Sequence, residues 1–201
     1  MKHAVVAGHI CLDIIPDIDR PIPLDPGRLY EVGSATIATG GAVSNTGVAL
    51  HLLGVATTLM GKIGSDDFGA AVRSVLDGYG AELTSGMLVS PGETTSYTVV
   101  VNIPGTDRIF LHCPGANSTF VCADLDLATI AAADLFHFGY PSFMAGQHAN
   151  GAAELVAMYK TVRELGTTTS LDLGMPDPSG PAGGLDWRGI LERTVPHLDV
   201  F

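Results

Sequence analysis

Short apolar runs alternate with helical patterns along most of this chain, and this alternation limits the possible folds more than any other feature. A buried strand is predicted at 3–10. From residue 42 onward, the pattern predicts helices and strands in turn at 42–53, 55–64, 65–80, 123–131, 133–140, 146–165, 167–174 and 187–194. Strands separated by helices form parallel sheets that are covered on both faces, so we predict an α/β fold.

Two segments interrupt this alternation and predict a small β appendage. At 94–112, two β-branched runs flank Pro104-Gly105. Because proline followed by glycine favours the centre of a type II turn, we predict a hairpin there. At about 10–39, two extended pieces surround a loop that is rich in proline and glycine. We therefore predict lid strands in both segments, suited to closing over a site and excluding water, although an ordinary surface β-ribbon is the alternative.

The charge and the cysteines of the chain argue against several classes of function. The 10 Lys and Arg against 21 Asp and Glu give a net charge of −11, which disfavours a nucleic-acid partner. No apolar run reaches the ~18 residues of a membrane-spanning helix, so no membrane partner is predicted. The seven histidines show no metal-ligand spacing, so no metal site is predicted. A reducing, cytoplasmic setting is favoured by the odd number and the spacing of Cys11, Cys113 and Cys122.

The helix predicted at 42–53 follows two glycines and carries one side-chain amide, Asn45, among apolar residues. A buried amide without partners costs roughly 1–3 kcal/mol, so Asn45 is expected to bond to backbone, to a side chain or to a ligand. Gly40 and Gly41 let a ligand approach the backbone, and the first-turn N–H groups point outward. A polyhydroxyl ligand would satisfy both sets of groups. The alternative is that Asn45 braces the neighbouring loop and the glycines form a tight turn.

Two aspartates at the ends of predicted strands are further candidates. Asp13 lies among apolar residues, where a carboxylate is costly unless it is paired or hydrogen-bonded. Accepting two sugar hydroxyls would satisfy it, whereas an exposed strand-end position or a loop cap is the simpler reading of this residue alone. Asp172 lies where open α/β sheets place ligand groups, which predicts a phosphate or ATP side of a site. Capping the following loop is an equally good reading of Asp172.

The lid supplies the remaining candidates. Tyr97 and Val99 on the hairpin, and Asn117 in the turn after it, are predicted to line the mouth of a site. Four aromatic residues provide either an apolar slot for a purine or core packing, and core packing is favoured for Tyr97, Phe110, Phe138 and Tyr140. The sequence lacks the GxxxxGK[ST] phosphate loop, the GxGxxG dinucleotide motif and the GxSxG nucleophile elbow.

The segment GGAVSNTGVALHLLGVATTLMGKIGSDDFG, residues 40–69, resembles the N-terminal signature of the ribokinase/pfkB-type carbohydrate kinases. It has Gly-Gly, an Asn four residues on, a Leu-Gly helix end, a strand, and a G-x-D-x-x-G motif at Gly64, Asp66 and Gly69. The GxxxxD opening at Gly8 and Asp13, the lid hairpin and the Gly-Ala-Asn turn also match. The resemblance therefore covers essentially the whole chain.

This resemblance implies a ribokinase-like three-layer α/β/α fold and phosphoryl transfer from ATP, with Mg²⁺, to a hydroxymethyl group of a sugar or nucleoside. In the family, substrate hydroxyls are held by residues that match Asp13, Gly40, Gly41 and Asn45, whereas the G-x-D-x-x-G region is mainly structural. Lids of this kind often pair between subunits, so a homodimer through the lid is also implied. Two alternatives to a sugar kinase stay open: a nucleoside kinase of the same family, and a non-catalytic carbohydrate-binding or dimerisation remnant.

Departures from the family pattern limit what the chain is expected to do. The second family signature, Gly-Ala-Gly-Asp, carries the catalytic base and is missing, so it is expected beyond Phe201. We therefore expect residues 1–201 to be the N-terminal part of one domain, with the acceptor-substrate half of the site and without the ATP-binding part. Such a fragment is predicted to be inactive alone. Ala42 stands where ribokinases often carry Lys, which disfavours ribose or ketodeoxygluconate as the substrate.

Overall fold

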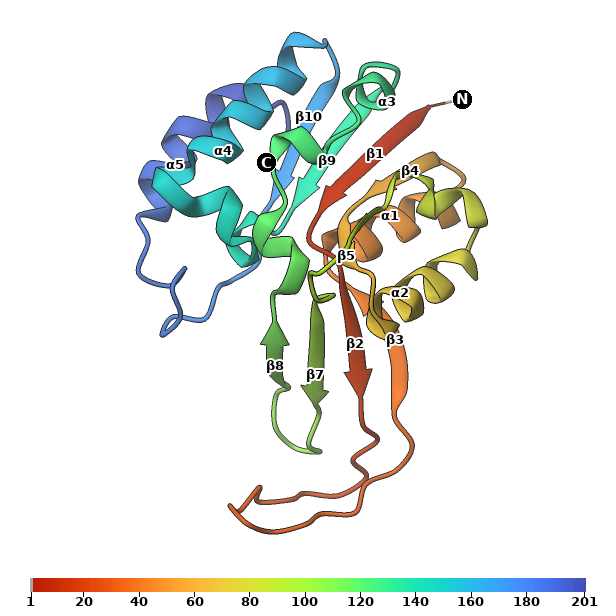
Figure 1. The fold of residues 1–201 in the computed structure, drawn as a ribbon. Helices are drawn as coiled ribbons and strands as arrows, with labels where there is room; N and C mark the ends of the chain where they lie inside the picture. The colour runs from red at the N-terminus through yellow and green to blue at the C-terminus, as the bar shows by residue number, and fades with distance from the viewer. Residues whose placement is uncertain (1) are drawn as a thin grey trace.

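A computed structural model describes residues 2–201 and shows a β-sheet between two layers of helices (Figure 1). The central sheet is parallel, with the strand order β10 (Thr168–Asp172), β9 (Leu135–Gly139), β1 (His3–Gly8) and β4 (Ala56–Met60). One face is covered by α1 (Ala42–Leu52) and α2 (Asp67–Asp77). The other face is covered by α3 (Leu127–Ala131), α4 (Ala145–Glu164) and α5 (Trp187–Thr194). This arrangement confirms the predicted α/β fold.

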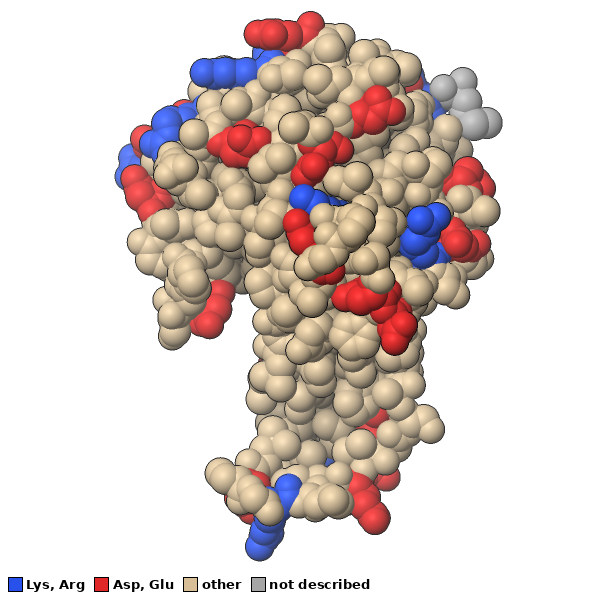
Figure 2. Space-filling view, viewed as in Figure 1, with Lys and Arg blue, Asp and Glu red and all other residues tan. Residues whose placement is uncertain are grey.

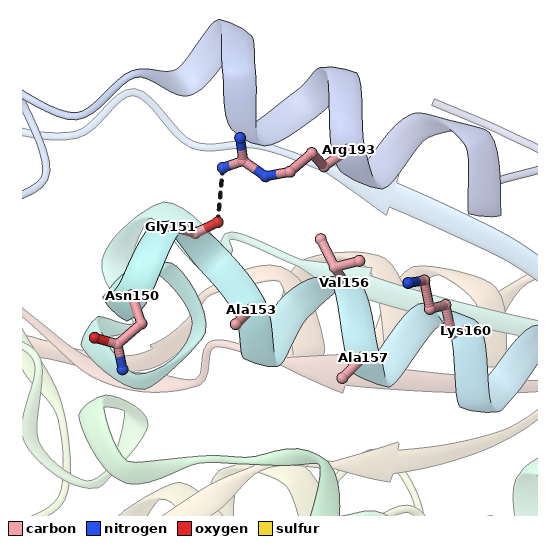
Figure 3. Close-up of a pocket in the computed structure, with 7 residues that line it drawn as sticks. All are labelled: Asn150, Gly151, Ala153, Val156, Ala157, Lys160 and Arg193. Carbon is pink, nitrogen blue, oxygen red and sulfur yellow. Dashed lines mark hydrogen bonds between the residues drawn. The ribbon is translucent and has the colours of Figure 1, made fainter.

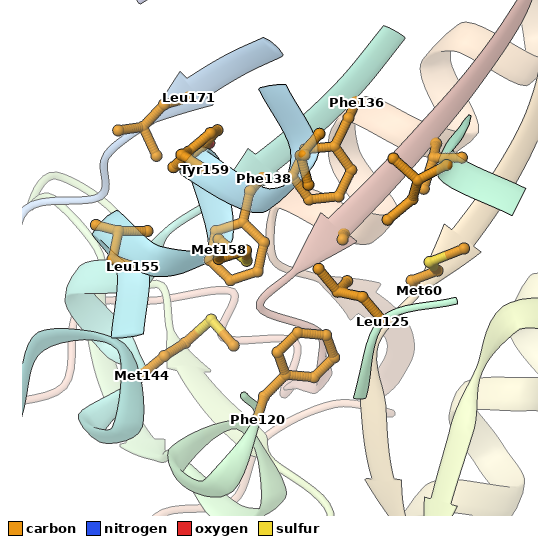
Figure 4. Close-up of a cluster of buried hydrophobic side chains, with 14 of the residues drawn as sticks. Met60, Phe120, Leu125, Phe136, Phe138, Met144, Leu155, Met158, Tyr159 and Leu171 are labelled. Carbon is orange, nitrogen blue, oxygen red and sulfur yellow. The ribbon is translucent and has the colours of Figure 1, made fainter. Parts of the chain in front are cut away.

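Strand β1 shows how the sequence produces these layers. Successive side chains of a strand point to opposite faces of the sheet. Val5 and Ala7 belong to the apolar cluster beneath α4 and α5, whereas Val6 belongs to the cluster beneath α1 and α2. All three are fully buried, as expected for a parallel sheet between two helical layers. In the first cluster, Phe136 and Tyr159 pack edge to face with ring centroids 6.1 Å apart (Figure 4).

A second four-stranded sheet, called the lid below, extends away from the body (Figure 1). Its order is β3 (Thr36–Gly40), β2 (Cys11–Ile15), β7 (Tyr97–Val101) and β8 (Ile109–Cys113). Strands β7 and β8 form the predicted hairpin. The N–H of Thr106 donates to the carbonyl of Ile103 at 3.2 Å, and Gly105 has a φ of 87°, which are the features of a type II turn. The hairpin and its turn are therefore confirmed, and the segment at 10–39 contributes β2 and β3.

Other predicted elements differ from the structure. The strand predicted at 55–64 breaks at Gly61, because β5 (Lys62–Gly64) leaves the main sheet and pairs with β6 (Leu88–Ser90). The helix predicted at 123–131 is shortened to α3, because the side chain of Asp126 caps its first turn. Near the end of the chain, Val200 forms a single parallel bridge with Ser170 of β10. Short 3-10 helices occupy Ala81–Gly86, Gly115–Thr119, Cys122–Asp124, Pro141–Phe143 and Val195–His197.

Helix α4 is interrupted near its start, where the sequence predicts one continuous helix. Asn150, Gly151 and Ala152 have left-handed backbone conformations with φ values of 52°, 69° and 61°. Arg193 of α5 donates to the carbonyl of Gly151 at 2.7 Å, which holds the bend against α5 (Figure 3). The bend borders an open hollow of about 560 Å³ that also exposes Lys160 (Figure 3). None of the site residues predicted from the sequence lines this hollow.

No helix between residues 2 and 201 is long and apolar enough to cross a membrane.

Candidate functional site

The carboxyl ends of three main-sheet strands meet in one row at the base of the lid. Gly8, Gly139 and Asp172 pair across β1, β9 and β10. Helix α1 begins beside this row, where a side chain added at Gly139 would overlap Ala42. Ligands of open α/β sheets bind outside the carboxyl ends of the strands. A site is therefore expected between this edge and the lid.

Asp13 and Gly40 lie together on neighbouring lid strands close to that edge. In the pairing of β2 with β3, Asp13 lies opposite Ala38, and Cys11 lies opposite Gly40. A Cβ atom at Gly40 would overlap Oδ2 of Asp13, so glycine leaves the space that this carboxylate occupies. Burial raises the pKa of the Asp13 carboxyl, and hydrogen bonds from the Cys11 and Thr98 side chains offset part of the rise. The arrangement brings together two of the residues that the sequence singled out.

Gly41 begins α1 in a conformation that favours glycine, with a φ of 87°. A Cβ atom here would overlap the carbonyl oxygen of His9 and lie 2.5 Å from its Nδ1. The N–H of Val43 donates to the same carbonyl at 3.1 Å. Gly41 therefore joins the helix start closely to the link between β1 and β2, and one of the first-turn N–H groups that the sequence offered to a ligand is already used.

Asn45 is exposed, although the sequence predicts a buried amide there. The prediction was wrong because α1 is covered on fewer sides than its apolar composition implies. The buried polar residue of this turn is Ser44, whose hydroxyl lies 2.7 Å from that of Thr39. Asn45 lines an open groove of about 360 Å³ with Ala38, Thr39 and Ser44. It therefore lies beside the strand that carries Gly40, and an exposed amide needs no protein partner.

Tyr97 and Val99 lie on the face of the lid opposite Asp13. Both alternate along β7 with Thr98, which is the residue that pairs with Asp13. Tyr97 packs instead against α2, edge to face with Phe68, and the two ring centroids lie 5.3 Å apart. Thr98 pairs in turn with His112 on β8. Because paired residues share a face of the sheet, Thr98 and His112 lie on the Asp13 side, and the predicted mouth residues do not.

Asn117 is fully buried and does not line the mouth of the site. Its Oδ1 accepts a hydrogen bond from the N–H of Ile10 at 3.2 Å, and its Nδ2 donates to the Ile10 carbonyl at 2.9 Å. The side chain thus braces the link between β1 and β2. Among the aromatic residues, Phe138 is buried in the core as predicted, whereas Phe110 on β8 is 55% exposed.

Two histidines connect the lid to the body, and sequence reasoning did not single them out. Nε2 of His9 lies 3.3 Å from Nε2 of His112, and Nδ1 of His112 lies 3.0 Å from the Thr98 hydroxyl. Thr98 donates to the sulfur of Cys11 at 3.6 Å, and Cys11 donates to Oδ1 of Asp13 at 3.3 Å. A chain of polar contacts therefore runs from the body to the Asp13 carboxylate. No sequence spacing indicates it, because sheet pairing alone brings these residues together.

Aromatic rings pack against the histidine pair on its body side, where His9 is buried and His112 keeps an exposed edge. The rings of Phe143 and Tyr140 lie 5.5 and 6.3 Å from the ring of His9, measured between centroids. Burial, together with the neighbouring His112, lowers the pKa of His9 to about 3. Burial also lowers the pKa of His112. Both rings are therefore neutral near pH 7, with Nδ1 of His9 buried and unpaired within residues 2–201.

Asp172 holds the turn that follows β9. Its Oδ1 accepts a hydrogen bond from the N–H of Tyr140 at 3.2 Å and lies 3.7 Å from Nε2 of His137. Tyr140 has a left-handed backbone with a φ of 60°, so this contact supports the loop-capping reading of Asp172. Burial raises the pKa of the Asp172 carboxyl, and His137 offsets part of the rise. Within residues 2–201, no cluster of three or more His, Cys, Asp or Glu could hold a metal ion.

Comparison with known proteins connects this geometry to a family. Residues 1–200 match the pfkB family of carbohydrate kinases. The chain belongs to this family. It is 29% identical over 174 residues to the ATP-dependent ribose-1-phosphate kinase of Halopiger xanaduensis, a match that covers 87% of this chain and 55% of that protein. It is 27% identical over 177 residues to fructokinase-2 of Solanum lycopersicum, covering 87% of this chain and 51% of that protein.

Solved structures show the same fold. A fructokinase from Xylella fastidiosa superposes with a TM-score of 0.77 at 22% identity, over 98% of this chain and 58% of that one. A ribokinase from Thermotoga maritima gives a TM-score of 0.71 at 17% identity, over 100% of this chain and 59% of that one. The ribokinase-like fold implied by the sequence resemblance is thus confirmed. This pfkB-family chain spans about half the length of the curated relatives that it matches.

Proposed function

We propose that this chain carries the sugar-binding half of a pfkB-family carbohydrate kinase, with Asp13 accepting hydrogen bonds from sugar hydroxyls. The proposal rests on the fit between the Asp13 carboxylate and the bare backbone of Gly40, at the base of a lid. The raised pKa of this carboxyl means that its charged form has too few partners in the protein alone. Hydroxyl donors from a sugar would supply them. Gly41 and Asn45, at the adjoining helix start, complete the proposed site.

The proposed reaction is phosphoryl transfer from ATP to a hydroxymethyl group of the bound sugar. One relative is named as ATP-dependent, and a fructokinase of this fold was solved with bound ATP. We place the catalytic base, the ATP pocket and Mg²⁺ outside residues 1–201, in the remainder of one domain whose N-terminal part this chain forms. The 201 residues alone are then expected to be inactive. A cytoplasmic location is part of the proposal, supported by three free cysteines.

The structure favours a sugar over a nucleoside as the acceptor. A purine needs an aromatic slot beside the hydroxyl-binding residues. Of the four aromatic residues considered for that slot, Phe138 lies in the core, Tyr97 lies on the opposite face of the lid and Phe110 lies on its exposed outer strand. Tyr140 alone of the four lies beside the site, with its ring 6.3 Å from that of His9. Fructokinases recur among the relatives, so fructose is the first sugar to test.

A thermal-shift screen of sugars and nucleosides tests this proposal. A ligand at 100 times its dissociation constant adds about 2.7 kcal/mol to the free energy of unfolding. For a domain of this size, that raises the melting temperature by roughly 5–10 °C. Fructose or another free sugar is expected to produce the shift. A shift with nucleosides alone would indicate a nucleoside kinase, and a stop codon directly after residue 201 in the coding DNA would favour a non-catalytic remnant.

A homodimer through the lid is a further part of the proposal. The outer strand β8 exposes three consecutive apolar residues, Ile109, Phe110 and Leu111. Figure 2 shows few charged residues on the lid between the body and the loop at its tip. Phe110→Asp is expected to convert a dimer to a monomer in light scattering. Met175→Asp is expected to leave the dimer intact, because Met175 is exposed in the loop after β10, away from β8. A monomeric wild-type protein would contradict this part of the proposal.

A further inference from the structure

Three polar side chains form a row across one face of the lid. Asp13, Thr98 and His112 occupy directly paired positions on β2, β7 and β8. Cys11 lies on the same face, two residues before Asp13. The row therefore reaches from the proposed hydroxyl-binding carboxylate to the outer strand of the lid.

His9 connects the end of this row to the body. It directly follows β1 and places its Nε2 3.3 Å from Nε2 of His112. Phe143 packs against both rings, with centroid distances of 5.5 Å to His9 and 6.0 Å to His112. The contact thus joins β8, the strand furthest from β3 in the lid, to the carboxyl edge of the main sheet.

Two ring nitrogens at hydrogen-bond distance share one proton, because one must donate and the other must accept. If His9 donates from Nε2, His112 carries its own proton on Nδ1 and donates to the hydroxyl of Thr98. Thr98 is then free to donate to Cys11, as the observed contact requires, and Cys11 donates to Asp13. In the opposite arrangement, the single proton of the Thr98 hydroxyl would be donated to His112. Thr98 would then have no proton left to donate to Cys11. The first arrangement directs every donor toward the carboxylate.

We propose that His9 and His112 are positioning residues of the acceptor site, whose shared proton docks β8 onto the body and keeps Thr98 and Asp13 oriented toward the sugar. The orientation toward a sugar rests on the proposed function, whereas the docking contact does not. Both ring nitrogens of His112 are engaged by protein atoms, so its role is to hold other groups in place.

Protonation of both rings would break this contact, because two N–H groups would then face each other. Around the pair, the titratable groups are Asp13 and Cys11 on β2 and Tyr140 after β9. Neither the Asp13 carboxyl nor the Cys11 thiol is in contact with an imidazole ring of the pair. In the docked lid, burial holds the pKa of both histidines below the ordinary value. Below about pH 6.5, the two histidines therefore bind protons more readily in the undocked lid than in the docked lid. The equilibrium constant for docking falls by up to ~10-fold for each pH unit and each proton bound.

The ring nitrogens can be observed directly by ¹⁵N NMR of the ligand-free protein. At pH 7.5, we expect both rings to be neutral, with the proton of His9 on Nε2 and that of His112 on Nδ1. Identical tautomers, or a charged ring at this pH, would overturn the proposal. This measurement needs no sugar, so it remains decisive if the proposed function fails.

Binding of fructose then tests the positioning role. His112→Ala and His112→Asn, whose side chain is too short to reach His9, are each expected to weaken binding about tenfold at pH 7.5. At pH 5 the fructose affinity of each variant should approach that of wild type. Any titration of Asp13 affects variant and wild type alike, so it does not change the ratio of their affinities. His51→Ala, which alters a half-buried histidine bonded to the Tyr79 carbonyl away from the lid, should match wild type at both pH values. Wild-type affinity in both His112 variants, or a ratio that is unchanged at pH 5, would overturn the proposal.

Discussion

Asp13→Asn is expected to weaken sugar binding by about 100-fold, or ~2.7 kcal/mol, at pH 7.5. The carboxylate can accept two hydroxyl groups at once, and hydrogen bonds to a charged acceptor are roughly twice as strong as neutral ones. The Asn side chain has nearly the same shape but provides one accepting oxygen and no charge. Its size still fits the space that Gly40 leaves open. Isothermal titration with the sugar identified by the screen measures the change.

The same substitution is expected to leave the free energy of unfolding unchanged or to raise it. Burial raises the pKa of the Asp13 carboxyl above its unfolded value, so the charged form is disfavoured in the folded state at neutral pH. Removing that charge removes the cost. Asp19→Asn, on the exposed loop of the lid, is the matched control and should change neither property. Normal sugar affinity in Asp13→Asn, or a loss of affinity matched by a lower melting temperature, would remove Asp13 from the site.

Gly41→Ala is expected to lower the free energy of unfolding by about 3–4 kcal/mol, because two costs combine. The φ of 87° is unfavourable for any residue with a Cβ atom. In addition, the new methyl group would overlap the backbone carbonyl of His9, and neither the helix start nor β1 can move without disturbing the core. Urea denaturation followed by circular dichroism measures the loss.

Gly54→Ala separates the two costs. Gly54 has a similar positive φ of 83°, but no atom lies within 4 Å of the position that a Cβ would take. We expect it to lose only ~1 kcal/mol, which is the conformational part alone. Equal losses at the two glycines would show that the close approach of α1 to His9 contributes nothing.

The order of strands and helices could be predicted because each depends on local sequence. Helix α5 has the predicted bounds, since its apolar spacing and the cap at Asp186 lie within the same ten residues. The bend in α4 could not be predicted in the same way. A single glycine among alanines is tolerated in a helix. The contact that accompanies the bend comes from Arg193, which is 42 residues further along the chain.

The candidate site was predictable only in part, for a related reason. The contact between Asp13 and Gly40 was expected, because the GxxxxD opening and the Gly-Gly pair lie on two adjacent strands. Because side chains alternate along β7, Tyr97 and Val99 lie on one face of the lid and Thr98 on the other. This alternation alone does not show which of the two faces carries Asp13. That choice depends on the register with β2, which the sequence of β7 does not contain. His9 and His112 likewise become neighbours only through pairing across several strands.

The buried amide of Asn117 has a consequence for how the lid can move. Only His9 and Ile10 separate β1 from β2, and Asn117 bonds both backbone groups of Ile10, as a neighbouring strand would. This fixes the point at which the lid leaves the body, so any opening has to come from bending further out. Displacement then grows toward the distal loop and is smallest near residue 13. The backbone at Asp13 would therefore move little between the open and closed forms, and docking of His112 onto His9 would set only the orientation of the Asp13 carboxylate.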